Sequence, residues 1–348
     1  MKTTTIVWQH VFGMVCLVAS SAVQAQPARG QSPAAQRSSE TERHAQPCVA
    51  RAPERTIFPQ GTLLWGTERQ RAEDESSSVL VSVALDSLRR DGERVSGPAP
   101  SGGRLVGGAS RGTVGSVAAG TELRAIASDG RSVDVVLCNT EPSPGDPELV
   151  WYSVEYWNEQ TESWENPCAG TVEVPQPRAL LVPGVWGADG ARRDPPGGAT
   201  LACETGVIAK CIQWGYKPWA TKNGDTLADH HQACTRMARA DYCGNGRSHT
   251  RTGTGIDMYD SAGVQQRTTE RTAGWDPARA VFEAAWTPEG AYCMTRSWDG
   301  RAIEGILGEC PGRFEAKADE DLGNGDRCAF RRAGAVATSV LLRNRLAP

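Results

Sequence analysis

Histidine and aspartate side chains in the second half of the chain are the residues whose types and spacing could carry chemistry. His230 and His231 are adjacent, His249 follows, and Asp241 and Asp257 are near them in the sequence. An imidazole beside a carboxylate can act as a general base or bind zinc. Adjacent histidines near a helix start point in different directions, however, so at most one can face a given site. These five residues are the catalytic candidates, but we expect neither a metal nor a cofactor.

Asp241 also has a structural explanation. It follows two arginines and can pair with Arg236, Arg239 or Arg247, or cap the next turn through Gly246. The neighbouring Tyr242 would then pack its ring and place its hydroxyl on a polar group. We therefore expect this stretch to stabilise the fold. A hydrogen bond to a loop is likewise the simpler role for His249.

Cysteine is the other reactive residue type, with eleven copies. Cys16 lies in the amino-terminal apolar segment, which leaves an even number, and an even number in an exported chain predicts disulfides. The chain has no C-x-x-C pair, which is the spacing typical of zinc ligands. A nucleophilic Cys243 beside His249 would need a free thiolate, which a bridged cysteine lacks. The cysteines expected in disulfides are Cys48, Cys138, Cys168, Cys203, Cys211, Cys234, Cys243, Cys293, Cys310 and Cys328.

One helix should position most of these candidates. Residues 226–229 read Thr-Leu-Ala-Asp, a capping-box variant, and the following residues up to Ala240 favour a helix with Ala233 and Met237 on one face. The stretch 243–246, Cys-Gly-Asn-Gly, should end it.

The length of that helix limits the disulfide pairing. If it runs to about Tyr242, Cys234 and Cys243 lie roughly 13 Å apart at about 1.5 Å per residue. A disulfide requires Cα atoms within about 7 Å. The two cysteines should therefore pair elsewhere, and Cys203 and Cys211 are the natural partners.

The remaining pattern is that of short strands. Alternating apolar residues, an Asp-Gly turn at 129–130 and a Thr-Pro-Glu-Gly turn at 287–290 predict antiparallel hairpins. The 38 glycines and 21 prolines also favour loops over a helix bundle. We therefore predict a mainly β (α+β) fold of antiparallel, short-stranded sheets with one principal helix, stapled by disulfides. The expected strands are 79–85, 123–127, 132–137, 150–157, 280–286 and 291–297.

The amino terminus has the three parts of a secretory signal peptide. Lys2 gives it positive charge, an apolar run follows, and small residues precede a cleavage position near Ala25. Gln9 and His10 keep the run below the roughly 20 residues of a spanning helix, so we expect no membrane span after cleavage. The product would be secreted, periplasmic or at the cell surface. Residues 26–47, rich in proline, serine and glutamine, should form a disordered tether.

Several ordered stretches resemble a known family. The run 233–250 contains Ala240-Asp241-Tyr242-Cys243, and it is flanked by further stretches that agree. Together they resemble the ADYC domain, an uncharacterised family of predicted exported bacterial proteins named for that tetrapeptide. The resemblance implies a shared fold over residues 148–345, behind a β-rich region at 48–147, and it implies no reaction. The flanking stretches are Trp164 to Cys168, Cys203, 210–219, 253–260, 282–293 and Cys310-Pro311.

Composition excludes some partners and leaves others open. The net charge is −4, or −5 once Lys2 is removed with the signal peptide, and no basic stripe suggests nucleic acid. Trp214, Tyr216 and Trp219 could form a platform for a sugar or belong to the core, and the acidic loop 319–326 could bind calcium or form a solvated turn. We expect a non-catalytic binding or structural module with a cell-envelope or extracellular ligand; the alternative is a secreted hydrolase of such polymers.

Overall fold

The computed structural model of the chain describes residues 46–49, 63–67, 80–90, 93–94, 99–101, 104–106, 120–127, 130–251 and 253–347, with only the backbone of the strands between 80 and 106 and of 317–319. The predicted signal peptide lies outside these residues, as does the predicted tether apart from Gln46 and Pro47. None of the helices described is long and apolar enough to cross a membrane.

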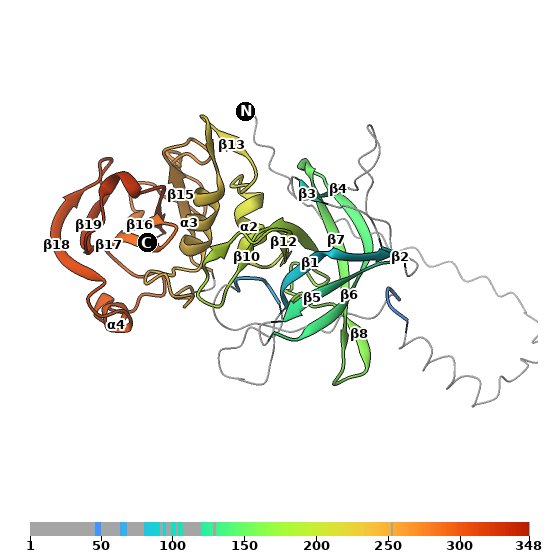
Figure 1. The fold of residues 1–348 in the computed structure, drawn as a ribbon. Coiled ribbons are helices and arrows are strands. Elements are labelled where there is room, and N and C mark those ends of the chain that lie inside the picture. Colours follow the sequence, from blue (N-terminus) through green and yellow to red (C-terminus); the bar gives the residue numbers. More distant parts are fainter. Residues whose placement is uncertain are drawn as a thin grey trace, which may run out of the picture. The chain divides into compact units, whose positions relative to one another are not determined.

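The fold is mainly β, and Figure 1 labels most of its elements. They are β1 (Leu80–Arg90), β2 (Glu93–Arg94), β3 (Ala99–Ser101), β4 (Arg104–Val106), β5 (Thr121–Ala127), β6 (Ser132–Ser143), β7 (Asp146–Asn158), β8 (Ser163–Glu165), β9 (Ala179–Pro183), β10 (Val185–Trp186), β11 (Arg192–Arg193), β12 (Gly198–Cys203), α2 (Val207–Gln213), β13 (Thr221–Lys222), β14 (Asp225–Thr226), α3 (Ala228–Ala238), β15 (Ile256–Asp260), β16 (Val281–Thr287), β17 (Gly290–Met294), α4 (Ile303–Glu309), β18 (Phe314–Asp321), β19 (Arg327–Arg332) and β20 (Leu342–Leu346).

The first large sheet is antiparallel and closes on itself. Its order is β12-β9-β7-β6-β5-β1-β2, with β8 beside β7, and β1 also pairs with β12. Alternate residues of β7, Val150, Tyr152 and Val154, belong to one buried cluster. Leu149 and Trp151, on the other face, belong to a second cluster that includes α2 and α3. The middle of β7 is therefore covered on both faces, whereas residues of β5 alternate between buried and less buried positions.

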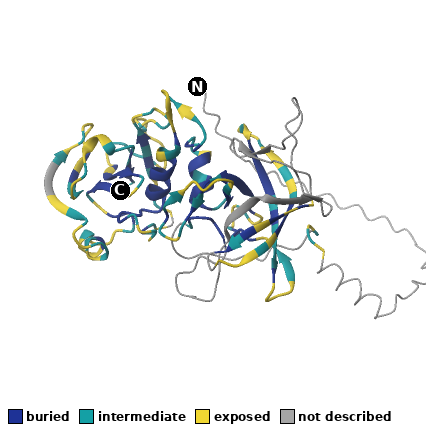
Figure 2. Ribbon diagram, viewed as in Figure 1, coloured by how far each residue is buried: buried dark blue, intermediate teal, exposed yellow. Residues whose placement is uncertain are grey.

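The second sheet carries the helix. Its order is β15-β20-β16-β17-β19-β18, again antiparallel, and α3 packs against β16, β17 and β20. Ala284 and Trp286 of β16 face the cluster that contains α3, whereas Phe282 and Ala285 face a third cluster. Figure 2 shows α3 largely in the colour of buried residues.

Both predicted hairpins are confirmed, and the helices show the limits of the sequence patterns. β5 pairs with β6 around Gly130, which has a φ of 82°, and β16 pairs with β17 at the Thr-Pro-Glu-Gly turn. The principal helix is present but begins after Leu227, without a side-chain cap, and ends at Ala238. Thr226 still accepts a hydrogen bond from the Ala228 amide, at 3.1 Å. The sequence patterns did not predict α2 and α4, each of which has seven residues.

All ten expected cysteines are bridged, in five pairs with Cα atoms 5.1–5.9 Å apart. Cys234 and Cys243 pair elsewhere, as predicted. The prediction that their partners would be Cys211 and Cys203 is right for Cys211 and wrong for Cys203, because β12 places Cys203 beside the loop after β8. The pairs are Cys48–Cys138, Cys168–Cys203, Cys211–Cys234, Cys243–Cys310 and Cys293–Cys328.

Candidate functional site

The Ala-Asp-Tyr-Cys stretch forms the end of α3. The Ala240 amide donates to the Met237 carbonyl (2.8 Å) and the Asp241 amide to the Arg236 carbonyl (2.9 Å). These two bonds form a Schellman motif, whose reversal of the chain needs a left-handed residue, usually glycine. Here that residue is Ala240, with a φ of 49° and no exposed surface. The backbone of Ala240 is therefore held in a left-handed conformation that costs a residue with a Cβ atom about 1–2 kcal/mol.

Asp241 is the centre of a buried polar network with Arg236 and the amides of Asn245 and Gly246, called the polar knot below. One carboxylate oxygen accepts the Asn245 amide (3.0 Å), and the other accepts the Gly246 amide (2.9 Å) and pairs with Arg236 Nη1 at 2.5 Å. The side chains of Asp241 and Arg236 are 1% and 4% exposed. Of the alternatives that the sequence left open, the structure selects the pairing with Arg236 together with the cap through Gly246. Both carboxylate oxygens are thus engaged within the protein.

Arg236 carries this knot to two other loops. Its Nη1 donates to the Asp189 carbonyl (2.6 Å), and its Nε donates to the Pro288 carbonyl (3.0 Å) in the β16–β17 turn. Gly190 passes so close that an added Cβ would lie 2.6 Å from Arg236 Nη1. The guanidinium therefore ties the end of α3 to the β10–β11 turn and to the second sheet.

Tyr242 belongs to a second buried network. Its hydroxyl donates to Glu283 Oε1 (2.6 Å) and accepts the Trp298 backbone N–H (2.7 Å). The other oxygen of Glu283 accepts the Asn344 side-chain amide, and Asn344 in turn accepts the Trp286 indole N–H (2.8 Å). Glu283 is fully buried, and burial raises the pKa of its carboxyl to about 7 against the lowering effect of these hydrogen bonds.

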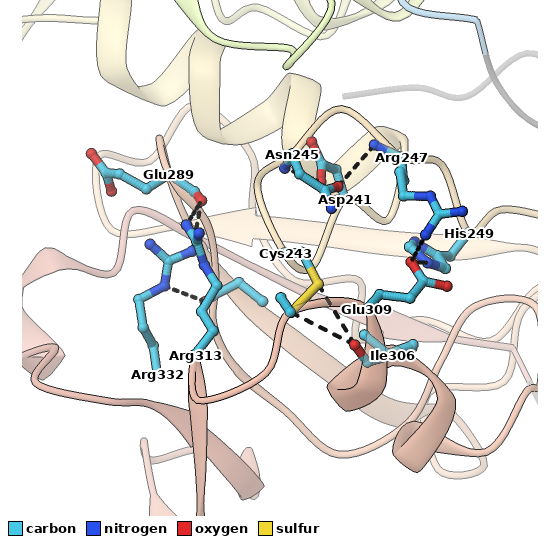
Figure 3. The surroundings of a disulfide bond; sticks show 12 residues. Asp241, Cys243, Asn245, Arg247, His249, Glu289, Ile306, Glu309, Arg313 and Arg332 are labelled. Carbon is cyan, nitrogen blue, oxygen red and sulfur yellow. Dashed lines mark hydrogen bonds and ion pairs between the residues drawn. A yellow bond between two sulfur atoms is a disulfide. The ribbon is translucent and has the colours of Figure 1, made fainter. Parts of the chain in front are cut away.

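Cys243 and His249 hold α4 (Figure 3). Cys243 forms its disulfide with Cys310 at the end of α4. The two ring nitrogens of His249 lie 3.0 Å from the Ala240 carbonyl oxygen and 3.0 Å from Glu309 Oε2. Glu309 also pairs with Arg247, at 3.2 Å. A nucleophilic Cys243 is therefore ruled out in this oxidised state, and His249 serves as a buried link between the motif and α4.

The adjacent histidines of α3 point to different surroundings, as predicted. The ring of His230 stacks near Tyr216, with centroids 6.5 Å apart, and burial lowers its pKa. The fully buried ring of His231 lies against Trp186 and places Nε2 3.0 Å from the Ile208 carbonyl oxygen. Burial lowers the pKa of His231 to about 3. Such a ring stays neutral and donates from Nε2.

The five candidates do not form one cluster. Asp257 accepts hydrogen bonds from the backbone and the hydroxyl of Thr268, the latter at 2.7 Å. No hydrogen bond or ion pair connects any two of the five within the described residues. In the same part of the chain, the one group of three metal-ligand side chains is Cys48, Cys138 and Glu155, in which the two cysteines are bonded to each other.

The aromatic and acidic stretches take structural positions. Tyr216 is fully buried and donates to Asp260 at 2.8 Å, while Trp214 and Trp219 pack against the core. In the acidic loop Asp326 is fully buried, with Tyr259 and Arg345 bonded to it at 2.8 Å. Neither stretch therefore offers an open aromatic platform or a free calcium loop.

Sequence reasoning missed the partner of Tyr242. The available signal was Glu283 itself, an acid within the otherwise apolar stretch Phe-Glu-Ala-Ala-Trp of β16. An acid in a buried strand must have compensating partners. Those partners, such as Asn344, are distant in sequence, so no local pattern could identify them.

The closed antiparallel sheet, the five disulfides and the buried polar motif define a class: a mainly β, disulfide-stapled protein assembled around one short helix. The family model of the ADYC domain matches residues 115–299, more than half of the 348 residues. The chain therefore belongs to the ADYC domain family. No curated protein and no solved structure matches it. The match begins before residue 148 and ends before residue 345, and the domain boundaries stay a prediction.

Proposed function

We propose that the chain is an exported, non-catalytic binding module that acts in the cell envelope or outside the cell. The observation that carries the proposal is the use of the motif's polar groups inside the fold. Both oxygens of Asp241 accept protein donors, the Tyr242 hydroxyl both donates and accepts, and Cys243 is in a disulfide. Groups so occupied are poorly placed to bind or activate a substrate.

Thiol chemistry supports the proposed compartment. Five disulfides, and the lack of a spanning helix among the residues described, are consistent with an extracellular or periplasmic protein. Within the proposal, the apolar segment that ends near Ala25 is the export signal of a bacterial protein, and the product is released from the membrane.

Export and binding are tested on the same sample. The full chain is expressed in a bacterium with a periplasm, recovered from that compartment and analysed by mass spectrometry without reduction. We expect a new amino terminus near Gln26 and no free thiol. The purified product is then incubated with peptidoglycan sacculi and with polygalacturonate gel. We expect the protein to be retained while the polymers release no soluble fragments.

The hydrolase alternative has a distinct result. Soluble fragments would appear, and their release would be lost in a variant such as His249→Gln that retains the unfolding transition of the wild type. That result would overturn the non-catalytic reading. A mature product with free thiols, or one found only in the cytoplasm, would overturn the proposed compartment.

A further inference from the structure

A pocket of about 380 Å³ lies beside the Tyr242 network. It is formed by the segment around Arg251 and Thr254, the loop after β17, the start of α4 and the end of β20. Its volume is within the roughly 300–1,000 Å³ of ligand pockets. Three arginines and no acidic side chain line it. The pocket is therefore positively charged in a protein whose net charge is −4.

The pocket has unused donors. Arg301 is already paired with Asp299 (2.5 Å) and lies 3.7 Å from Glu309. Arg251 and Arg296 are exposed, and their guanidinium groups have no hydrogen bond or ion pair to any residue that the structure describes. Over the same residues, the buried indole Nε1 of Trp298, itself 8% exposed, and the hydroxyl of Thr254 have no partner.

These groups define the chemistry of a ligand. Guanidinium groups donate and cannot accept, so the complementary ligand is rich in acceptors. Guanidinium groups match carboxylate and phosphate oxygens in a two-bond geometry. We propose that this pocket binds the oxyanion group of a ligand, a carboxylate or a phosphate, through Arg251 and Arg296. The inference rests on the proposed binding function and names the chemical class of its ligand.

The family motif supports the pocket from behind. The Trp298 backbone donates to the Tyr242 hydroxyl at 2.7 Å, so the motif fixes the position of one pocket wall. Arg251, Thr254, Arg296 and Trp298 all fall within the 115–299 match to the family model. Tyr242 thus positions one wall of the pocket, whereas the arginines are the residues that contact the ligand.

The test is calorimetric titration of the full mature protein at pH 7 and low salt. The probes are trigalacturonate, inorganic phosphate and the neutral sugar maltotriose. We expect an anionic probe to bind, the neutral sugar not to bind, and affinity to fall as salt is added. Arg251→Gln and Arg296→Gln should each weaken binding about tenfold, the effect of losing a charged hydrogen bond. Arg279→Gln, an exposed arginine outside the pocket, is the matched control and should leave affinity unchanged.

The outcomes separate the two proposals. Binding of trigalacturonate that depends on Arg251 and Arg296 identifies a carboxylate as the ligand group. Binding of phosphate with the same dependence identifies a phosphate. Either result supports the inference. Anion binding that is indifferent to both arginines, or equal binding of maltotriose, overturns it. If sacculi or gel retain the protein without dependence on Arg251 and Arg296, only the pocket inference fails. If no probe and no polymer is bound, the proposed binding function fails with it.

Discussion

Replacing Glu283 with glutamine removes the buried carboxyl group and changes the side-chain shape little. The two donors that face this carboxyl group, Tyr242 and Asn344, suit its ionised form. Burial nevertheless raises its pKa to about 7, from 4.5 in an exposed glutamate. The folded protein therefore holds a proton over a pH range in which the unfolded chain has already lost it.

The sign and size follow from this difference. An acid whose folded-state pKa is raised contributes stability that is complete below the unfolded pKa and is lost as pH rises through the folded pKa. The two pKa values differ by about 2.5, and one pKa unit corresponds to about 1.4 kcal/mol. The wild type should therefore lose about 3 kcal/mol relative to Glu283→Gln between pH 4.5 and 8. The glutamine amide also faces the donating Asn344 amide, which costs about 1–3 kcal/mol at every pH and leaves the slope unchanged.

Urea unfolding of the oxidised proteins across this pH range measures the difference. The matched control is Glu304→Gln on the exposed side of α4, which makes the same chemical substitution and leaves the network intact. Its unfolding free energy should follow the wild type. A wild-type minus Glu283→Gln difference that stays constant, or grows, as pH rises would refute the argument that burial controls this carboxyl group.

Other perturbations have expected sizes as well. Replacing Cys243 and Cys310 with serine removes a disulfide of sequence separation 67 and should lower the free energy of unfolding by about 4 kcal/mol. Removing Cys211–Cys234, of separation 23, should lower it by about 3 kcal/mol. Urea unfolding measures both losses, and the reverse ranking would contradict the loop-entropy argument. Asp241→Asn leaves a buried guanidinium without its carboxylate and should cost about 3–5 kcal/mol by thermal unfolding, and a loss below about 1 kcal/mol would contradict the knot. Burial lowers the pKa of His231 to about 3 from 6.5, so its contribution to the free energy of unfolding is present above pH 6.5 and is lost as pH falls. The wild type should therefore lose about 3 kcal/mol of unfolding free energy relative to His231→Gln by pH 4. If no such loss is measured, the ring is accessible to water. Ala240→Gly should change stability by less than about 1 kcal/mol, since relief of the left-handed φ offsets the lost methyl group and the added chain entropy; a loss above about 2 kcal/mol would mean that packing dominates.

The strands and turns were predictable because their signals are local. Alternating residues and the Asp-Gly and Pro-Glu-Gly turns lie within a few positions of one another, and they located β5, β6, β16 and β17. α2 and α4 lack such signals. Neither has a side-chain cap, and α4 contains Gly305 and Gly308, each of which costs about 1 kcal/mol in a helix. Tertiary packing forms these helices, with Cys211 of α2 and Cys310 after α4 bonded to distant segments.

The sequence predicted the kinds of contact that the motif residues make, but not which residues are their partners. Residue types and the helix pattern indicated that Asp241 would pair with an arginine and that Tyr242 would place its hydroxyl on a polar group. Which arginine, and which polar group, depends on where α3 lies on the second sheet. The pocket arginines carried no signal, because Arg251 and Arg296 are ordinary exposed residues until the fold brings them to one pocket.

The four residues of the motif act on four different parts of the molecule, which explains why they must be adjacent. Ala240 reverses the chain, Asp241 closes the following loop, Tyr242 reaches β16 and the loop after β17, and Cys243 fixes α4. The tight reversal at the end of this buried helix directs successive side chains to these separate partners. A reactive centre would bring its groups together, whereas this motif sends them apart. Any role of the motif in binding then passes through structure, by the hydrogen bond from Trp298 to Tyr242 that positions the pocket wall.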